Sequence, residues 1–222
     1  MTDLDCFEVH PGAGPARASI VMLHGLGADG TDFLPFADEL DLTAVGPVRW
    51  VLPRAPVRAV TINGGHRMRA WYDIRQADLV RQEDEGGLRE SFAQVGRLLD
   101  REVARGVPAS RIVLAGFSQG CAVTLGAGLR YGHRLAGLAG LSGYLPLAVT
   151  MLAERHAANA DVPVFLGHGS SDGVVPVARG AAARDALQAL GHTVDWHSFP
   201  MEHSVSVEEI RALNAWLRRV LA

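Results

Sequence analysis

Short apolar runs alternate with amphipathic stretches along the whole chain, and this alternation restricts the fold more than any other feature. Six runs are candidate strands, most of them short apolar runs of the kind buried on both faces, at 19–23, 49–52, 111–115, 138–142, 162–167 and 194–199. Five stretches have the spacing of amphipathic helices, at 32–42, 84–105, 119–130, 176–190 and 207–221. The alternation predicts an α/β fold with a mostly parallel central sheet and helices on both faces.

Nothing in the sequence divides the chain into separate units. No internal repeat, low-complexity tract or linker interrupts the 222 residues, so we predict a single domain over 1–222. The segment 53–85 mixes prolines, glycines and aromatic residues and is predicted to be a long irregular segment, which is often functional. The uncharged stretch 135–152 is broken by three glycines and a proline, which predicts a buried strand and a loop rather than a membrane helix.

The charged and reactive side chains exclude several classes of function. All 21 basic residues are arginine, so the chain has no Schiff-base lysine and no P-loop lysine. A formal net charge of −3 gives no broad attraction for nucleic acid or for an anionic membrane surface. Cys6 and Cys121 cannot by themselves build a disulfide framework or a zinc site, and acidic residues precede the first apolar run. We therefore expect a cytoplasmic protein that acts on small molecules.

The motif Gly-Phe-Ser-Gln-Gly at 116–120 lies between a predicted strand and a predicted helix. A G-x-S-x-G motif in this context is typical of a nucleophile elbow. The turn is sharp, so a side chain at Gly116 or Gly120 would collide with its neighbours while Ser118 is left exposed. Ser118 is therefore the candidate nucleophile, and the Gln119 N–H at the helix N-terminus is a candidate oxyanion donor. The alternative is a glycine-rich turn without catalytic meaning, which the flanking strand and helix make less favoured.

A serine hydroxyl needs a base, and the base needs an acid that orients it. In enzymes with such an elbow, these partners follow in the order serine, acid, histidine, each in the loop after a later strand. Asp172 follows the run 162–167 and is the candidate acid, with a turn-forming or helix-capping aspartate as the alternative. His203 follows the strand predicted at 194–199 and is the candidate base, with a solvent-facing loop histidine as the alternative.

The glycine-rich loop after the first predicted strand has two interpretations. As the second oxyanion site, its glycines allow the backbone N–H of Leu26 to turn toward the nucleophile. The same residues, 25–30, also match the dinucleotide fingerprint G-x-G-x-x-G. That interpretation requires an acidic residue at the end of the next strand, where the chain has Arg54. An oxidoreductase is therefore the weaker interpretation, because it leaves the later serine, aspartate and histidine unexplained.

Several ordered segments together carry a resemblance to a known family. They are 24–30, 52–56, 63–65, 68–74, 116–120, 141–146, His168–Gly169 with Asp172 and 175–176, and His203. Over nearly the whole chain, the sequence resembles the small carboxylesterase/phospholipase family of α/β-hydrolases, which includes acyl-protein thioesterases and compact bacterial carboxylesterases. The resemblance implies a single-domain α/β-hydrolase fold with no metal and no cofactor. One position departs from the family, where Glu202 replaces the glycine that commonly precedes the catalytic histidine.

The resemblance also implies site residues and a substrate class. It assigns Ser118, Asp172 and His203 as the triad, and it assigns the N–H groups of Leu26 and Gln119 as oxyanion donors. It implies hydrolysis of esters of short to medium acyl chains, with lysophospholipids and thioesters as further substrates. Met68 and Trp71 are candidate walls of the acyl pocket, and a core role for Trp71 is equally favoured. An apolar rim at 68–72 fits either lipid contact or a homodimer interface.

Two other functions are kept open at this stage. A hydrolase scaffold can bind an acyl ligand without turnover, because the fold alone does not determine the function. Covalent labelling of Ser118 by a fluorophosphonate separates the two, because labelling requires an activated hydroxyl. Peptidase activity would need a cleft that the sequence neither shows nor excludes.

Overall fold

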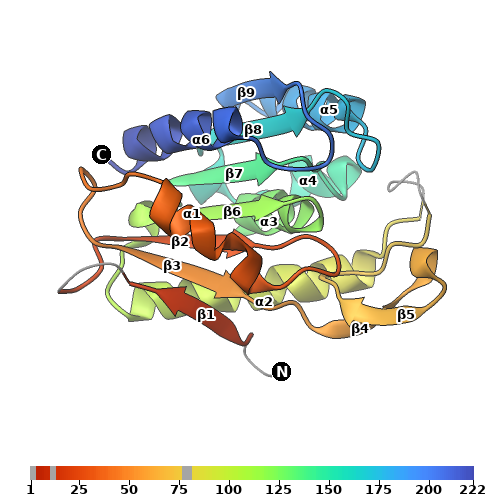
Figure 1. Ribbon diagram of the computed structural model, residues 1–222, viewed down its shortest axis with the longest axis horizontal. Coiled ribbons are helices and arrows are strands. Elements are labelled where there is room, and N and C mark those ends of the chain that lie inside the picture. Colours follow the sequence, from red (N-terminus) through yellow and green to blue (C-terminus); the bar gives the residue numbers. More distant parts are fainter. Residues whose placement is uncertain (1–3, 11–13, 77–81) are drawn as a thin grey trace.

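The protein is described by a computed structural model that covers residues 4–10, 14–76 and 82–222. Its centre is a seven-stranded sheet in the order β1-β3-β2-β6-β7-β8-β9 (Figure 1). The strands are β1 (Cys6–Val9), β2 (Ala18–Leu23), β3 (Val48–Pro53), β6 (Ile112–Phe117), β7 (Gly137–Leu141), β8 (Val164–Gly169) and β9 (Val194–Phe199). All neighbouring pairs are parallel except β1 and β3. The predicted mostly parallel sheet is confirmed.

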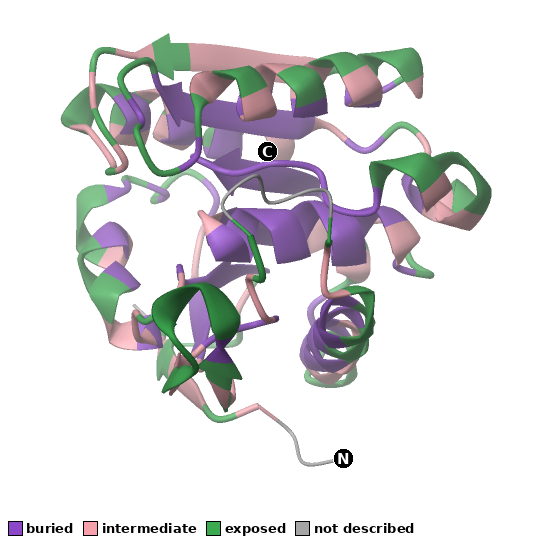
Figure 2. Cartoon of the chain, turned by 90° about the vertical axis from the view of Figure 1, so that its right-hand side faces the viewer, coloured by how far each residue is buried: buried purple, intermediate pink, exposed green. Residues whose placement is uncertain are grey.

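Helices cover both faces of the sheet, as the alternation predicts. They are α1 (Leu34–Glu39), α2 (Glu85–Ala104), α3 (Gln119–Arg130), α4 (Ala148–Glu154), α5 (Val177–Ala189) and α6 (Val207–Val220). Apolar residues of α1 and α6 form one core cluster with one face of the sheet, and those of α2, α3 and α5 form a second cluster with the other. Every residue of β2, β3, β7 and β8 is consequently buried, which explains their continuous apolar composition (Figure 2).

The structure corrects the sequence-based prediction in three places. The helix expected at 32–42 is a 3-10 helix, Gly30–Phe33, followed by the short α1, whose second residue, Pro35, has no N–H to donate. The described part of the segment 53–85 is not wholly irregular, because β4 (Val57–Val60) and β5 (His66–Arg69) form an antiparallel hairpin. The loop expected toward residue 152 contains the beginning of α4.

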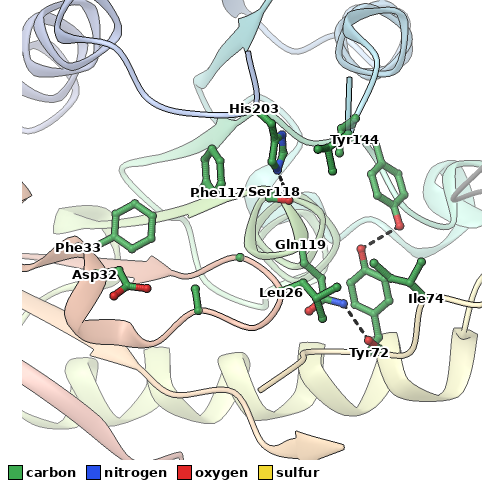
Figure 3. Close-up of a pocket in the computed structure, with 14 residues that line it drawn as sticks. Leu26, Asp32, Phe33, Tyr72, Ile74, Phe117, Ser118, Gln119, Tyr144 and His203 are labelled. Atoms are coloured by element: carbon green, nitrogen blue, oxygen red, sulfur yellow. Dashed lines mark hydrogen bonds between the residues drawn. The ribbon is translucent and has the colours of Figure 1, made fainter. Parts of the chain in front are cut away.

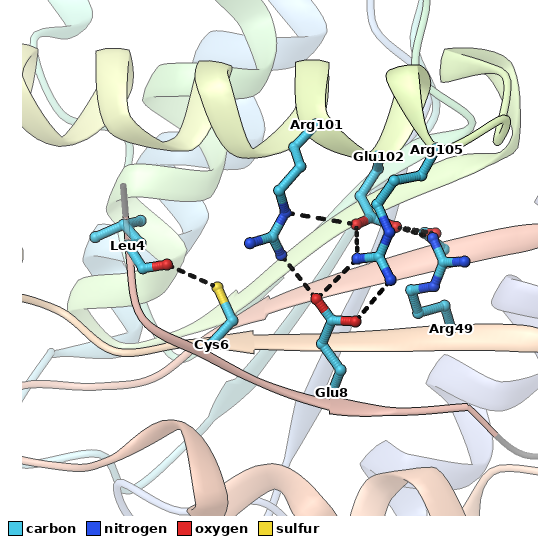
Figure 4. Close-up of polar contacts among 8 residues, drawn as sticks. Leu4, Cys6, Glu8, Arg49, Arg101, Glu102 and Arg105 are labelled. Atoms are coloured by element: carbon cyan, nitrogen blue, oxygen red, sulfur yellow. Dashed lines mark hydrogen bonds and ion pairs between the residues drawn. The ribbon is translucent and has the colours of Figure 1, made fainter. Parts of the chain in front are cut away.

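Strand β1 was not predicted, because side chains distant in sequence hold it in place. Arg101 of α2 and Arg105, directly after its last residue, both bind the Glu8 carboxylate, at 2.9 and 2.8 Å (Figure 4). Arg105 also reaches Glu102, which is fully buried and accepts hydrogen bonds from Arg49 and Ser19 at 2.9 and 2.8 Å. The edge strand is therefore fastened by ion pairs to α2 rather than by an apolar run of its own.

No helix in the described ranges 4–10, 14–76 and 82–222 is long and apolar enough to cross a membrane. The uncharged stretch 135–152 forms β7, a turn and the start of α4. The prediction that this stretch is not a membrane helix is confirmed.

Glu209, in the first turn of α6, is a fully buried carboxyl group against Gly167 of β8. Neither carboxyl oxygen has a hydrogen-bond partner in the described residues, and burial raises the pKa of Glu209 from 4.5 to about 8. The folded protein therefore binds this proton more tightly than the unfolded chain. The contribution of this bound proton to the free energy of unfolding is complete below about pH 4.5 and is lost progressively as the pH rises toward 8.

We expect the free energy of unfolding of the Glu209→Gln variant to lack the pH-dependent contribution of the Glu209 carboxyl group. Between pH 5 and pH 8 the wild type should lose about 3 kcal/mol relative to Glu209→Gln, because an uncharged amide does not titrate. Urea denaturation at both pH values measures the difference. The control is Glu208→Gln, a change of the exposed neighbouring residue. Its free energy of unfolding should show the same pH dependence as that of the wild type. Identical pH dependence in the wild type and Glu209→Gln would contradict the expectation.

Candidate active site

The strand β6 and the helix α3 meet at Ser118 in a strained turn. Ser118 has φ 55° and ψ −115°, in a region that L-residues rarely adopt. A Cβ on Gly116 would lie 2.7 Å from Thr124 Oγ1 and would overlap the backbone of Gly120. A Cβ on Gly120 would overlap the carbonyl of Leu23 and lie 2.7 Å from that of His24. The two glycines are thus required by the close approach of β2, β6 and α3.

Gly120→Ala tests this packing. We expect a loss of about 3 kcal/mol in the free energy of unfolding, because backbone oxygens cannot move aside as side chains can. The matched control is Gly96→Ala in the middle of α2, where a Cβ meets nothing within 4 Å. That change should stabilise the protein by about 0.5–1 kcal/mol. Equal effects of the two alanines in urea denaturation would show that the elbow is not tightly packed.

Ser118, His203 and Asp172 are joined in a chain of two hydrogen bonds. The Ser118 hydroxyl donates to His203 Nε2 over 2.8 Å (Figure 3). His203 Nδ1 donates to Asp172 Oδ2 over 2.7 Å, because a carboxylate oxygen only accepts. The proton on Nδ1 leaves Nε2 as the acceptor, which is the tautomer that a general base requires. The structure therefore brings together the three side chains that the sequence placed in separate loops.

The loops that carry Asp172 and His203 are fastened to each other. Ser170 N–H donates to Phe199 O, and Ser171 N–H donates to Met201 O, at 2.8 and 3.1 Å. The Asp172 side chain is fully buried, and its Oδ1 accepts the N–H groups of Val174 and Val175, both at 2.8 Å. Its second oxygen is left to face His203. The acid is thus held in one orientation by the backbone around it.

The two predicted oxyanion donors belong to residues that line the same pocket as Ser118. Leu26 and Gln119 both line that pocket, and no hydrogen bond within the described residues uses either N–H. The loop of Leu26 is ordered by the buried His24, whose Nδ1 donates to Gly25 O at 2.7 Å. The other nitrogen of His24 accepts from Ala55 N–H at 3.0 Å. Leu26 and Gln119 therefore remain the predicted oxyanion donors.

The Gln119 side chain has a positioning role that the sequence did not reveal. Its Oε1 accepts from Trp71 N–H at 2.8 Å. Its Nε2 donates to Tyr72 O, also at 2.8 Å (Figure 3). The side chain is buried and bonds the elbow to the segment that forms one wall of the pocket. Its partners lie 47 and 48 residues away, so no local motif signals the contact.

We expect Gln119→Leu to lower the free energy of unfolding by about 2–4 kcal/mol. The substitution leaves two buried backbone groups without partners, and each costs about 1–3 kcal/mol. Thermal and urea denaturation measure the loss. Gln188→Leu, on the exposed face of α5, is the matched control and should change stability little. An unchanged Gln119→Leu protein would show that the two bonds do not hold the segment.

The pocket beside Ser118 has a volume of about 370 Å³, within the range of small-ligand sites. The structure does not place the two candidate wall residues on this pocket, and Trp71 has the core role that was the alternative. Trp71 is fully buried, with its indole N–H on His24 O at 2.8 Å, and neither it nor Met68 lines the pocket. The lining from this segment comes from Tyr72 and Ile74 instead. Residues 70–72 are buried, so the predicted exposed rim at 68–72, and with it the basis for a lipid contact or homodimer there, is not found.

Three further expectations are resolved by the geometry. The loop 25–30 leads into a four-residue 3-10 helix, and Arg54 is bound to Asp29 at 3.0 Å, so the dinucleotide interpretation is not supported. The Glu202 side chain is exposed and has no hydrogen bond or ion pair in the described residues. Cys121 is buried, and burial raises the pKa of its thiol to about 12, as expected for a packing residue rather than a nucleophile.

A serine, a histidine and an aspartate joined in this order at the carboxyl edge of a parallel sheet define a serine hydrolase of the α/β-hydrolase class. A family model described as Phospholipase/Carboxylesterase matches residues 4–221. The chain therefore belongs to the phospholipase/carboxylesterase family of α/β-hydrolases.

Curated relatives and solved structures agree with this membership. Acyl-protein thioesterase 1 of Yarrowia lipolytica is 37% identical over 212 residues, which cover 93% of each chain. Carboxylesterase SOBER1 of Arabidopsis thaliana is 31% identical over 93% of this chain and 92% of its own. Its crystal structure superposes with a TM-score of 0.88 over 93% of this chain and 100% of its own. The crystal structure of Zea mays acyl-protein thioesterase 2 is 31% identical in sequence and superposes with a TM-score of 0.86. The match covers 98% of this chain and 99% of its own.

Proposed function

We propose that the protein hydrolyses carboxylic esters and thioesters of short to medium acyl chains through an acyl-enzyme on Ser118. The observation that carries the proposal is the hydrogen-bonded chain from Asp172 through His203 to Ser118, which opens on a pocket with two unused N–H donors. Relatives named as thioesterases and as carboxylesterases support the substrate class. No feature of the site favours an acyl-binding protein without turnover.

The proposed mechanism uses each group once in each half of the reaction. His203 Nε2 takes the hydroxyl proton as Ser118 Oγ attacks the acyl carbon, and the N–H groups of Leu26 and Gln119 hold the oxyanion. His203 then returns the proton to the leaving oxygen or sulfur. His203 then acts as the base for the water that attacks the acyl-enzyme, and the carboxylic acid product is released. Asp172 keeps the Nδ1 proton in place and stabilises the imidazolium that forms.

The side of the pocket toward β7 supports the acyl-chain assignment. Its wall contains Ile74 and the tyrosines Tyr72 and Tyr144, whose hydroxyls share a hydrogen bond of 2.8 Å (Figure 3). Both tyrosines are buried, and burial raises the pKa of each phenol, so the pair is neutral in the physiological range. A largely apolar, uncharged wall suits an alkyl chain.

The experiment that tests the function is hydrolysis of p-nitrophenyl esters from acetate through dodecanoate, together with matching thioesters. We expect an optimum at short to medium chains and a decline toward dodecanoate, because the pocket volume of about 370 Å³ limits the length of the acyl chain. Absence of turnover with every ester and thioester would overturn the proposal. We further propose a cytoplasmic location, which the free thiols Cys6 and Cys121 support.

A further inference from the structure

The pocket continues past Ser118 on the side away from the tyrosine pair. This side, which we name the aromatic arm, is lined by Ala28, Asp32, Phe33 and Phe117. Figure 3 shows Phe33 and Phe117 on one side of Ser118 and the tyrosines on the other. The two ring centroids of the arm lie 6.3 Å apart with planes tilted by 49°. The aromatic arm thus has a different chemistry from the acyl side.

The position of His203 assigns the aromatic arm to the leaving group. In the proposed mechanism His203 Nε2 must protonate the leaving atom, so the leaving group lies against the imidazole. The Phe117 ring packs on His203 with centroids 4.8 Å apart. A leaving group that receives the proton from His203 therefore extends along Phe117 toward Phe33 and Asp32.

Asp32 gives the aromatic arm a negative charge that no neighbour neutralises. Its carboxylate accepts a hydrogen bond from Asp29 N–H at 3.0 Å and has no ion pair in the described ranges. The cations of this region, Arg54 and Arg69, are both held by Asp29 at 3.0 Å. Arg54 also binds Asp5 at 3.1 Å, so two carboxylates balance two guanidinium groups and the charge of Asp32 is left over.

We propose that the aromatic arm selects esters whose alcohol or thiol carries a positive charge, above all a quaternary ammonium group. Aromatic faces attract such cations, and a nearby carboxylate adds a Coulombic term. In the reaction the acyl C–O bond breaks, His203 gives its proton to the leaving oxygen, and water completes the acid. The products are a carboxylic acid and a cationic alcohol. This inference rests on the proposed esterase function and names its leaving-group class.

A pair of substrates of equal shape tests the inference. Butyrylcholine and 3,3-dimethylbutyl butyrate share the acyl group. They differ in one atom of the alcohol, which is a positively charged nitrogen in the first ester and a neutral carbon in the second. We expect kcat/KM for the cationic ester to exceed that for the neutral ester by about tenfold at low salt. Because Asp32 is exposed, this ratio should fall as ionic strength rises.

The variant Asp32→Asn isolates the charge, because its amide oxygen still accepts the Asp29 N–H while the carboxylate is lost. We expect the ratio to fall close to one in Asp32→Asn and to keep its wild-type value in Asp38→Asn, an exposed carboxylate of α1. A ratio near one in the wild type, with Ser118-dependent turnover of the neutral ester, overturns the inference and leaves the proposed function standing. Failure to hydrolyse either ester overturns both. A wild-type ratio that persists in Asp32→Asn also contradicts the assignment.

Discussion

Ser118→Ala is expected to lower kcat/KM for p-nitrophenyl butyrate by at least about 10⁴-fold. The hydroxyl is hydrogen-bonded to His203 Nε2 at 2.8 Å, so its loss removes both the nucleophile and the route to the acyl-enzyme. Oxyanion donors and the binding pocket remain, and they can support only a weak direct attack by water. Initial rates at a range of ester concentrations measure the effect.

The stability of the variant separates chemistry from folding. Ser118→Ala deletes one hydroxyl of a half-buried side chain that lines the pocket, and the variant should unfold close to the wild type in urea. Ser110→Ala, just before β6 and at the opposite end of the sheet, provides the matched control with full activity. Retention of more than a few per cent of the wild-type rate by a folded Ser118→Ala protein would contradict the nucleophile assignment.

Asp172→Asn should cost about 10⁴-fold in kcat while the protein stays folded. The reason lies in the two N–H groups, of Val174 and Val175, that Asp172 Oδ1 accepts at 2.8 Å. In asparagine the amide oxygen must keep these donors, so the NH₂ group faces His203 Nδ1. The imidazole then carries its proton on Nε2, toward Ser118, and cannot act as a base.

The pH dependence of this variant distinguishes the tautomer from a folding defect. Activity of Asp172→Asn should rise steeply at alkaline pH, where hydroxide replaces the missing base. The control Asp185→Asn, on the exposed side of α5, should keep the wild-type profile. If Asp172→Asn retained more than a tenth of the wild-type kcat at neutral pH, Asp172 would not be the orienting acid.

The main elements of the fold could be predicted from the sequence, because burial on both faces of a strand gives a continuous apolar run. Strands β2, β6 and β8 are continuous apolar runs, and α3 has the bounds that its spacing predicts. The missed elements lack such a signal. Strand β1 is held by ion pairs to α2, and the hairpin of β4 and β5 is largely exposed. Their stabilising partners are distant in sequence or consist of each other.

The residues of the candidate site likewise include some that the sequence predicts and some that it does not. Ser118, Asp172 and His203 follow the parallel strands β6, β8 and β9, so parallel topology predicts that they meet at one edge. The pocket walls depend on side-chain packing, which is why the sequence left Trp71 between a wall role and a core role, whereas the structure shows it buried with its indole N–H on His24 O. The hydrogen bonds of Gln119 to the backbone at 71 and 72 and the Tyr72–Tyr144 pair likewise have no counterpart in any motif.

The formation of a covalent adduct on Ser118 tests the account most directly. The wild-type protein is incubated with a fluorophosphonate, digested and mapped by mass spectrometry, alongside Ser118→Ala and His203→Gln. We predict one adduct on the peptide that contains Ser118, no adduct in Ser118→Ala and strongly slowed labelling in His203→Gln, because the probe reacts only with an activated hydroxyl. An unlabelled wild-type Ser118, or labelling that persists elsewhere in Ser118→Ala, would contradict the account.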